Sequence, residues 1–76
     1  MTIKEIINLL EIERFKMCLN QYKFPYVLGI SRFTYMNNLH GRVQPQFQTL
    51  AKMVKFLNER GHAITFDQIE KPINDK

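Results

Sequence analysis

The sequence predicts a mostly α-helical fold, a compact bundle of about five short helices with a short C-terminal β-strand over residues 62–68. Three observations support this: apolar residues recur at helical spacing, glycine and proline mark the ends of segments, and apolar and polar residues alternate near the C-terminus. With 76 residues, 45% of them hydrophobic, the chain has the size of one domain. We expect that domain over residues 1–69, followed by a flexible tail over 70–76.

The N-terminal segment begins with a capping box, in which Thr2 and Glu5 each bind a backbone N–H of the first helical turn. Apolar residues then form two stripes, the first being Ile3, Ile6, Ile7 and Leu10, and the second Ile12, Phe15, Cys18, Leu19 and Tyr22. At about 100° per residue these stripes point roughly 130° apart, so one straight helix does not bury both. We therefore expect a break near residues 11–13 and two short helices.

Residues 21–41 contain the helix-start, turn and helix-stop residues of a helix-turn-helix. Pro25 suits the first turn of a short helix. Gly29 can take the positive φ of a tight turn, Ser31 can cap a second helix of about ten residues, and Gly41 fits just past its end. In a DNA-binding motif of this kind the second helix enters the major groove, and the alternative is a helical corner without nucleic acid.

A further amphipathic helix is expected after Pro45 and before Gly61, with an apolar stripe of Phe47, Leu50, Ala51, Val54 and Leu57. Met53 and Phe56 fall beside this stripe, where they either widen the core or form an apolar dimer patch. The predicted strand needs a partner strand, and the same strand of a second copy is a natural one. The predicted dimer interface is therefore Met53, Phe56, Ile64 and Phe66.

Composition limits the functional classes. Eleven Lys and Arg against seven Asp and Glu give a net charge of +4 and a pI near 9.5, which is compatible with binding a phosphate backbone. Cys18, the single cysteine, forms no intramolecular disulfide and is expected to be a small buried residue in a reducing cytoplasm. The sequence has neither an apolar run long enough to span a membrane nor a signal-peptide pattern, so we expect no membrane partner and a cytoplasmic location.

The residues that could bind a metal or act in catalysis do not cluster in the sequence. His40, His62 and Cys18 lack the close spacing of a zinc site, and Glu11 and Glu13, two positions apart, diverge on a helix. The sequence therefore predicts no metal, no cofactor and no enzymatic activity.

Beyond these patterns, the segment from Gly29 to Leu57 resembles the Cro and phage-repressor class of helix-turn-helix proteins, which have the lambda-repressor-like fold. The agreement covers Gln21, Leu28, Gly29, Ile30, Ser31, Arg32, Thr34, Gly41, Pro45, Thr49 and Leu50. Pro25 and Asn38 depart from it, because the family usually has a small residue and an apolar residue there. The resemblance implies a sequence-specific transcriptional regulator, a small phage-type repressor that binds double-stranded DNA as a homodimer on a two-fold operator.

The first turn of the second motif helix, and the residue one turn later, face the bases in such complexes. The expected base-reading residues are Arg32, Phe33, Thr34 and Asn37, although Phe33 is equally suited to the core. The expected contacts to the DNA backbone are Gln21, Lys23, Ser31, His40, Arg42 and Gln44. Lys52 and Lys55 are expected to be solvated.

The alternative function is a protein-interaction module on the same scaffold, an antirepressor or antitoxin that binds a repressor or a toxin. Met53, Phe56 and the terminal strand would then contact the partner protein.

Overall fold

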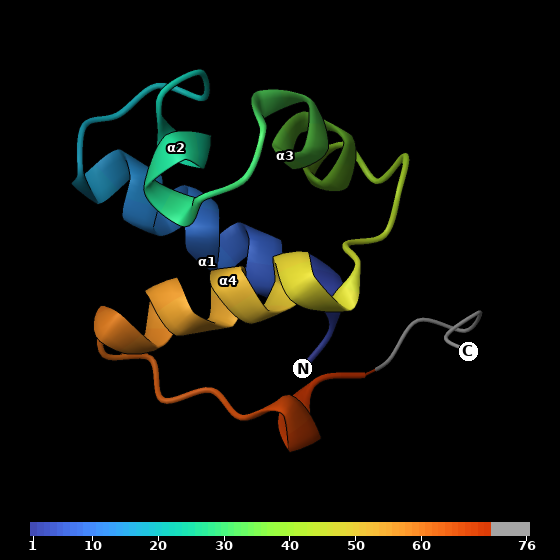
Figure 1. The fold of residues 1–76 in the computed structure, drawn as a ribbon. Coiled ribbons are helices and arrows are strands. Elements are labelled where there is room, and N and C mark those ends of the chain that lie inside the picture. The colour runs from blue at the N-terminus through green and yellow to red at the C-terminus, as the bar shows by residue number, and fades with distance from the viewer. Residues whose placement is uncertain (71–76) are drawn as a thin grey trace.

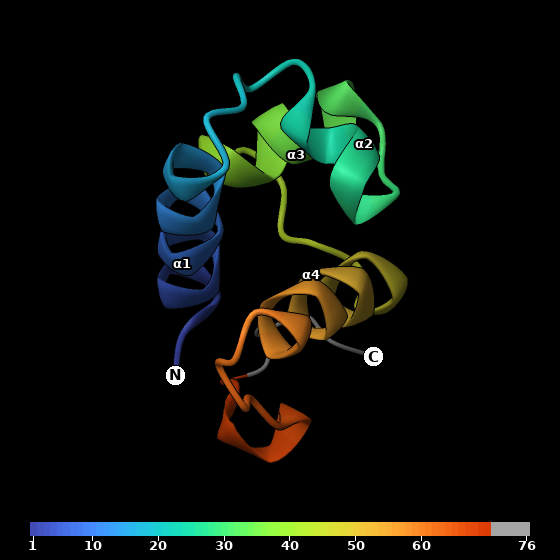
Figure 2. The ribbon, with the colours of Figure 1, turned by 90° about the vertical axis from the view of Figure 1, so that its left-hand side faces the viewer.

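The computed structural model describes residues 1–70, which form four α-helices and one 3-10 turn (Figure 1). The elements are α1 (Ile3–Lys16), α2 (Phe24–Leu28), α3 (Arg32–Leu39), α4 (Phe47–Glu59) and the 3-10 turn η1 (Phe66–Gln68). Helix α1 packs against α3 and α4, and α2 packs against the same two helices. Figure 2 shows α1 along one side of the molecule, with the other three helices beside it. The predicted helical bundle is confirmed, whereas the predicted tail lies outside the described residues except for Glu70.

Helix α1 is continuous, so the predicted break near residues 11–13 is wrong. The capping box at its start is present: the Thr2 hydroxyl accepts from the Glu5 N–H at 3.1 Å, and the Glu5 carboxylate accepts from the Thr2 N–H at 2.7 Å. No break is needed because the second apolar stripe is not buried as a set. Phe15 is 73% exposed, and Cys18, which was expected to be buried, is exposed with a positive φ of 57° just beyond the helix end.

The core is formed where α2, α3 and α4 meet the inner face of α1. The ring of Phe24 lies at its centre, edge-on to Tyr35 at 5.6 Å and to Phe56 at 5.5 Å between ring centroids. The buried hydrophobic cluster consists of Ile6, Leu10, Phe24, Leu28, Tyr35, Leu50, Met53, Val54, Phe56, Leu57, Ile64 and Ile69.

Three of the four residues predicted for the dimer interface belong to this core. Met53, Phe56 and Ile64 are at most 8% exposed, so their assignment to an apolar dimer patch is wrong. They are buried because α4 lies between α1 and α2 on one side and the C-terminal segment on the other, so it needs a wider apolar face than one stripe. Phe66 alone is exposed, stacked on Phe47 at 5.2 Å between centroids.

The predicted strand over residues 62–68 is also wrong, because the described segment forms no β-ladder and its last three residues form η1. The side chain of Asn58 takes the place of a partner strand: its Nδ2 donates to the Ile64 carbonyl at 2.9 Å, and its Oδ1 accepts from the Ile64 N–H at 2.5 Å. Further along, the Glu70 N–H donates to the Met1 carbonyl at 2.8 Å. These backbone groups are therefore satisfied inside one chain.

Glu13 fastens the C-terminal segment to α1. Its side chain is 3% exposed and accepts from Arg60 Nε at 2.9 Å and from His62 Nε2 at 2.7 Å. An ionised carboxylate only accepts, so the Nε2 of His62 carries a hydrogen. The bonds from His62 and Arg60 outweigh the cost of burial and lower the pKa of Glu13 from its ordinary 4.5 to about 2.

The Glu13 contacts predict an acid-sensitive stability. A carboxyl group whose pKa is lower in the folded chain contributes stability that is complete above its unfolded pKa and is lost as the pH falls through its folded pKa. The free energy of unfolding, measured by urea denaturation, should therefore decrease between pH 4.5 and about 2. Glu13→Gln should flatten this dependence and lower stability at pH 7. Glu59→Gln is the matched control, because Glu59 is 64% exposed; equal slopes for the two variants would contradict the prediction.

Candidate nucleic-acid interface

The turn between α2 and α3 has the geometry that the sequence predicts. Gly29 has φ 82° and ψ 29°, in the left-handed region. The Gly29 N–H donates to the Tyr26 carbonyl at 3.2 Å, and the Ile30 N–H donates to the Pro25 carbonyl at 3.1 Å, which is the bonding pattern of a Schellman motif. Ser31 then caps α3, its Oγ accepting from the Thr34 N–H at 3.0 Å. Both motif helices and the turn between them therefore lie where the capping and turn residues predict them.

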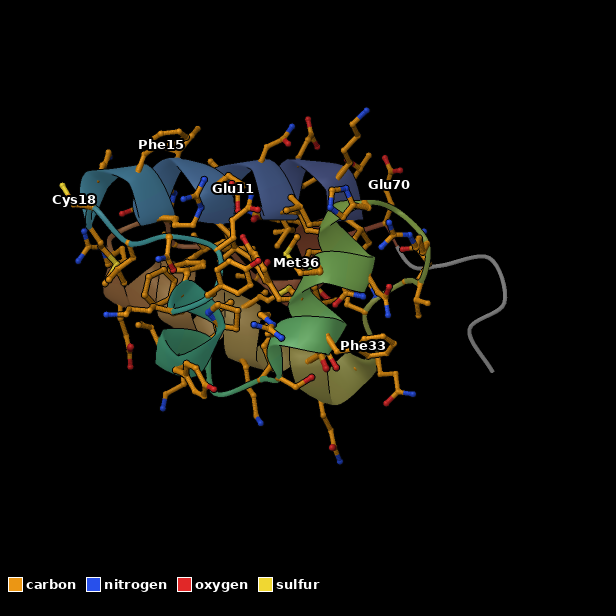
Figure 3. The ribbon with its side chains drawn as sticks, turned by 90° about the horizontal axis from the view of Figure 1, so that it is seen from above. Glu11, Phe15, Cys18, Phe33, Met36 and Glu70 are labelled. Carbon is orange, nitrogen blue, oxygen red and sulfur yellow. The ribbon has the colours of Figure 1, made fainter. Side chains whose placement is uncertain are left out.

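The leading end of α3 faces solvent. Ser31, Arg32 and Phe33 are all exposed, and Phe33 is 76% exposed. In Figure 3 the Phe33 side chain extends away from α1, on the far side of α3. Of the two interpretations of Phe33, core residue or surface contact, the structure is consistent only with the second. The guanidinium of Arg32 lies over the ring of the exposed Tyr22, 4.7 Å from its centroid.

The other two expected base-reading residues are half-buried. Thr34 Oγ1 accepts a hydrogen bond from Ser31 Oγ at 2.9 Å. Asn37 Oδ1 accepts from Arg42 at 3.4 Å, and the Asn37 carbonyl accepts from the Arg42 N–H at 2.9 Å. The four residues thus share one helix, but Arg32 and Phe33 present far more free surface than Thr34 and Asn37.

The opposite face of α3 is held by a polar network, the Glu11 network. It consists of Glu11 and Arg14 on α1, Gln21 in the loop before α2, and Tyr35 on α3. Tyr35 is fully buried and its hydroxyl donates to Glu11 Oε2. Arg14 donates to Glu11 Oε1 through Nε at 3.0 Å and Nη2 at 2.8 Å. Gln21 donates to the same oxygen at 3.3 Å, so an amide expected at the DNA backbone instead binds the protein.

Protonation states in the Glu11 network are well defined at neutral pH. Burial raises the pKa of Glu11, but the hydrogen bonds from Arg14, Tyr35 and Gln21 outweigh it and hold that pKa below its ordinary value. Burial, and then the bond to Glu11, raises the pKa of Tyr35. The hydroxyl is therefore a fixed donor and the carboxylate a fixed acceptor, which sets the rotation of α3 about its axis.

Lys52 contributes a contact that the sequence did not indicate. Its Nζ donates to the Gly29 carbonyl at 2.9 Å and so ties α4 to the turn of the motif. Sequence patterning placed this residue on the solvated face of α4, and no local signal marks a bond across 23 residues. Lys55, by contrast, is largely solvated, 3.9 Å from the exposed Glu59.

Charge is distributed unevenly along the chain. Residues 14–58, which include all of α2 and α3, contain no Asp or Glu, and their cations are Arg14, Lys16, Lys23, Arg32, Arg42, Lys52 and Lys55. The remaining residues that were predicted to contact the DNA backbone are all exposed: Lys23, Ser31, His40, Arg42 and Gln44. A segment with seven cations and no carboxylates favours contact with a polyanion.

Comparison of the chain with protein families, with curated proteins and with solved structures finds no match. Within residues 1–70, no group of three or more His, Cys, Asp and Glu side chains is placed to hold a metal ion. No helix in that same part of the chain has the length and apolar character needed to cross a membrane.

The Glu11 network predicts that Tyr35→Phe destabilises the protein although the ring remains. The variant removes one hydrogen bond to the half-buried, ionised carboxylate of Glu11. The free energy of unfolding should therefore fall by about 1.5–3 kcal/mol, as measured by urea denaturation. Tyr26→Phe is the matched control, because Tyr26 is 79% exposed; it should change stability by less than about 0.5 kcal/mol. Equal stability of the two variants would show that the network does not hold α3.

Proposed function

We propose that this chain binds double-stranded DNA in a sequence-specific manner and acts as a transcriptional regulator of the small phage-repressor type. The main supporting observation concerns α3: its capped N-terminal end is exposed to solvent, while its opposite face is held by the hydrogen bond from Tyr35 to Glu11. A major groove admits one helix presented in this way.

Arg32 and Phe33 are the proposed primary base contacts. An arginine can bind the O6 and N7 of guanine through two parallel hydrogen bonds, worth about 1–3 kcal/mol of discrimination. The contact of Arg32 with Tyr22 leaves these donors available, because the ring face interacts with the guanidinium as a cation rather than accepting its N–H groups in plane. Phe33 can contact a thymine methyl group, with Thr34 and Asn37 in supporting positions.

The flanking polar residues are proposed to contact phosphates. Lys23 precedes α2, and His40, Arg42 and Gln44 follow α3, so they bracket the exposed end of the recognition helix. Such contacts fix the orientation of the protein on the duplex without reading sequence.

The number of copies on one operator is part of this proposal. The family resemblance implies a homodimer on a two-fold site. Phe66 is the exposed member of the predicted dimer interface, and it forms an exposed aromatic pair with Phe47, which was predicted to belong to the buried stripe of its helix. The same pair supports the second candidate function, contact with a partner protein. A complex that survives high salt while DNA binding is lost would favour that second function.

Selection from a random duplex pool tests sequence-specific binding. The protein should enrich a defined sequence, and Arg32→Ala should weaken binding to it by roughly 5- to 150-fold, the equivalent of about 1–3 kcal/mol. Lys55→Ala removes the same charge from α4 and should leave the sequence preference unchanged. If the wild-type chain enriches no sequence over bulk DNA, the proposal fails.

Salt dependence separates the two kinds of contact. The logarithm of the association constant should fall linearly with the logarithm of salt concentration, because phosphate neutralisation releases counterions. Arg42→Ala should reduce the slope by about 1 and weaken all sequences alike. Fluorescence anisotropy with selected and scrambled duplexes measures both. A slope identical to that of the wild type would place Arg42 away from the DNA.

A further inference from the structure

The ring of Tyr22 lies against the guanidinium of Arg32, the residue that opens α3. The Arg32 Cζ is placed over the ring, 4.7 Å from its centroid. The two residues come from different segments, because Tyr22 belongs to the turn before α2 and remains 63% exposed. A cation over an aromatic face is attracted by the negative charge of that face. The contact therefore ties the turn before α2 to the first turn of α3.

The backbone that carries the Tyr22 ring is anchored on both sides. Its own N–H donates to Asn20 Oδ1 at 3.0 Å. The residue before it, Gln21, donates to a carboxylate of α1 at 3.3 Å, and Phe24, two positions later, is fully buried in the core. The ring thus extends from a fixed turn, whereas the guanidinium beside it is carried by a long, flexible side chain.

The ring has no competitor for this guanidinium among the described side chains. Within residues 1–70, Arg32 forms no ion pair, and the surrounding segment 14–58 contains no Asp or Glu. A freely rotating arginine loses side-chain entropy when a partner orders it, and this loss weakens binding. A ring face restricts the guanidinium without accepting its N–H groups in plane, so the donors stay available while their orientation is limited.

We propose that Tyr22 is a positioning residue for base recognition, which sets the strength of the base preference that Arg32 confers. This inference rests on the proposed function and adds to it a residue outside both motif helices. In the complex the ring stays on one face of the guanidinium, whose paired donors bind the O6 and N7 of guanine. Docking removes water from the pair, and a cation–π contact is stronger when it is desolvated. Tyr22 therefore raises affinity only for a duplex with the base pair that Arg32 reads.

Two substitutions separate the ring from the hydroxyl. Tyr22→Phe keeps the ring, so it should bind the duplex selected by the wild-type chain within about twofold of wild type. Tyr22→Leu removes the ring and should weaken that binding roughly 5- to 30-fold, the range from an exposed to a desolvated cation–π contact. A scrambled duplex should be bound within about twofold by every variant. Fluorescence anisotropy measures the affinities, and circular dichroism checks the fold.

The outcomes of this comparison are distinct. Equal losses in Tyr22→Phe and Tyr22→Leu would assign the role to the hydroxyl, as expected for a phosphate contact, and overturn the proposal. Equal losses on the selected and scrambled duplexes, or no loss in Tyr22→Leu, would also overturn it.

A double-mutant cycle shows whether Tyr22 acts through Arg32. In the Arg32→Ala background, Tyr22→Leu should cause no further loss on the selected duplex, because the guanidinium that the ring positions is gone. Duplexes with one substituted base pair each should show that both single variants lose discrimination at the same base pair. Equal losses in both backgrounds, or lost discrimination at a different base pair, would contradict the proposal.

NMR of the free chain tests the contact without DNA. The Arg32 Nε–H signal should move downfield in Tyr22→Leu, because ring shielding is lost, and stay near its wild-type position in Tyr22→Phe. An unmoved signal in Tyr22→Leu would refute the contact. A wild-type base preference that depends on Arg32 but not on Tyr22 would overturn this inference alone. A wild-type chain that selects no sequence would overturn the proposed function as well.

Discussion

Two carboxylates on α1, one half-buried and one buried, organise this molecule. Glu11 and Glu13 are two positions apart, so they diverge around the helix and each meets a different part of the chain. A buried charge is stable only when it is paired and hydrogen-bonded. Glu11 obtains its donors from Arg14, Gln21 and Tyr35, and Glu13 obtains its donors from the segment after α4. One helix therefore fixes both α3 and the C-terminal segment.

This arrangement gives α3 two different faces. The inward face carries Tyr35, whose ring packs on Phe24 and whose hydroxyl reaches the carboxylate, so that both the depth and the rotation of the helix are defined. The outward face then has a single orientation, with Arg32 and Phe33 projecting from its first turn. Preorganisation of this kind reduces the entropy lost when a surface docks on a rigid partner. Lys52 on α4 adds a hydrogen bond to the turn between α2 and α3.

Capping and turn residues in the sequence predicted the motif. The other features of the fold and the site depend on side-chain contacts and exposure that these local signals do not reveal. The capping residues Thr2 and Ser31 and the turn at Gly29 act within a few residues, so their geometry could be predicted from the sequence alone. The continuity of α1 could not, because the periodicity does not reveal that Phe15 and Cys18 of the second apolar stripe are exposed. The strand prediction failed for a different reason: the side chain of Asn58, six residues before Ile64, bonds the backbone of Ile64 in place of a partner strand. At the site, the exposure of Arg32 followed from the motif, whereas the Glu11 network and Lys52 had no local pattern.

The bond between the Glu70 N–H and the Met1 carbonyl brings the two ends of the described chain together. In Figure 1 both ends lie below α4, whereas α2 and α3 lie above it. Anything joined to the protein at either position would therefore leave from the side remote from the motif. A fluorescent reporter, a second domain or a surface anchor attached there should leave α3 sterically unobstructed.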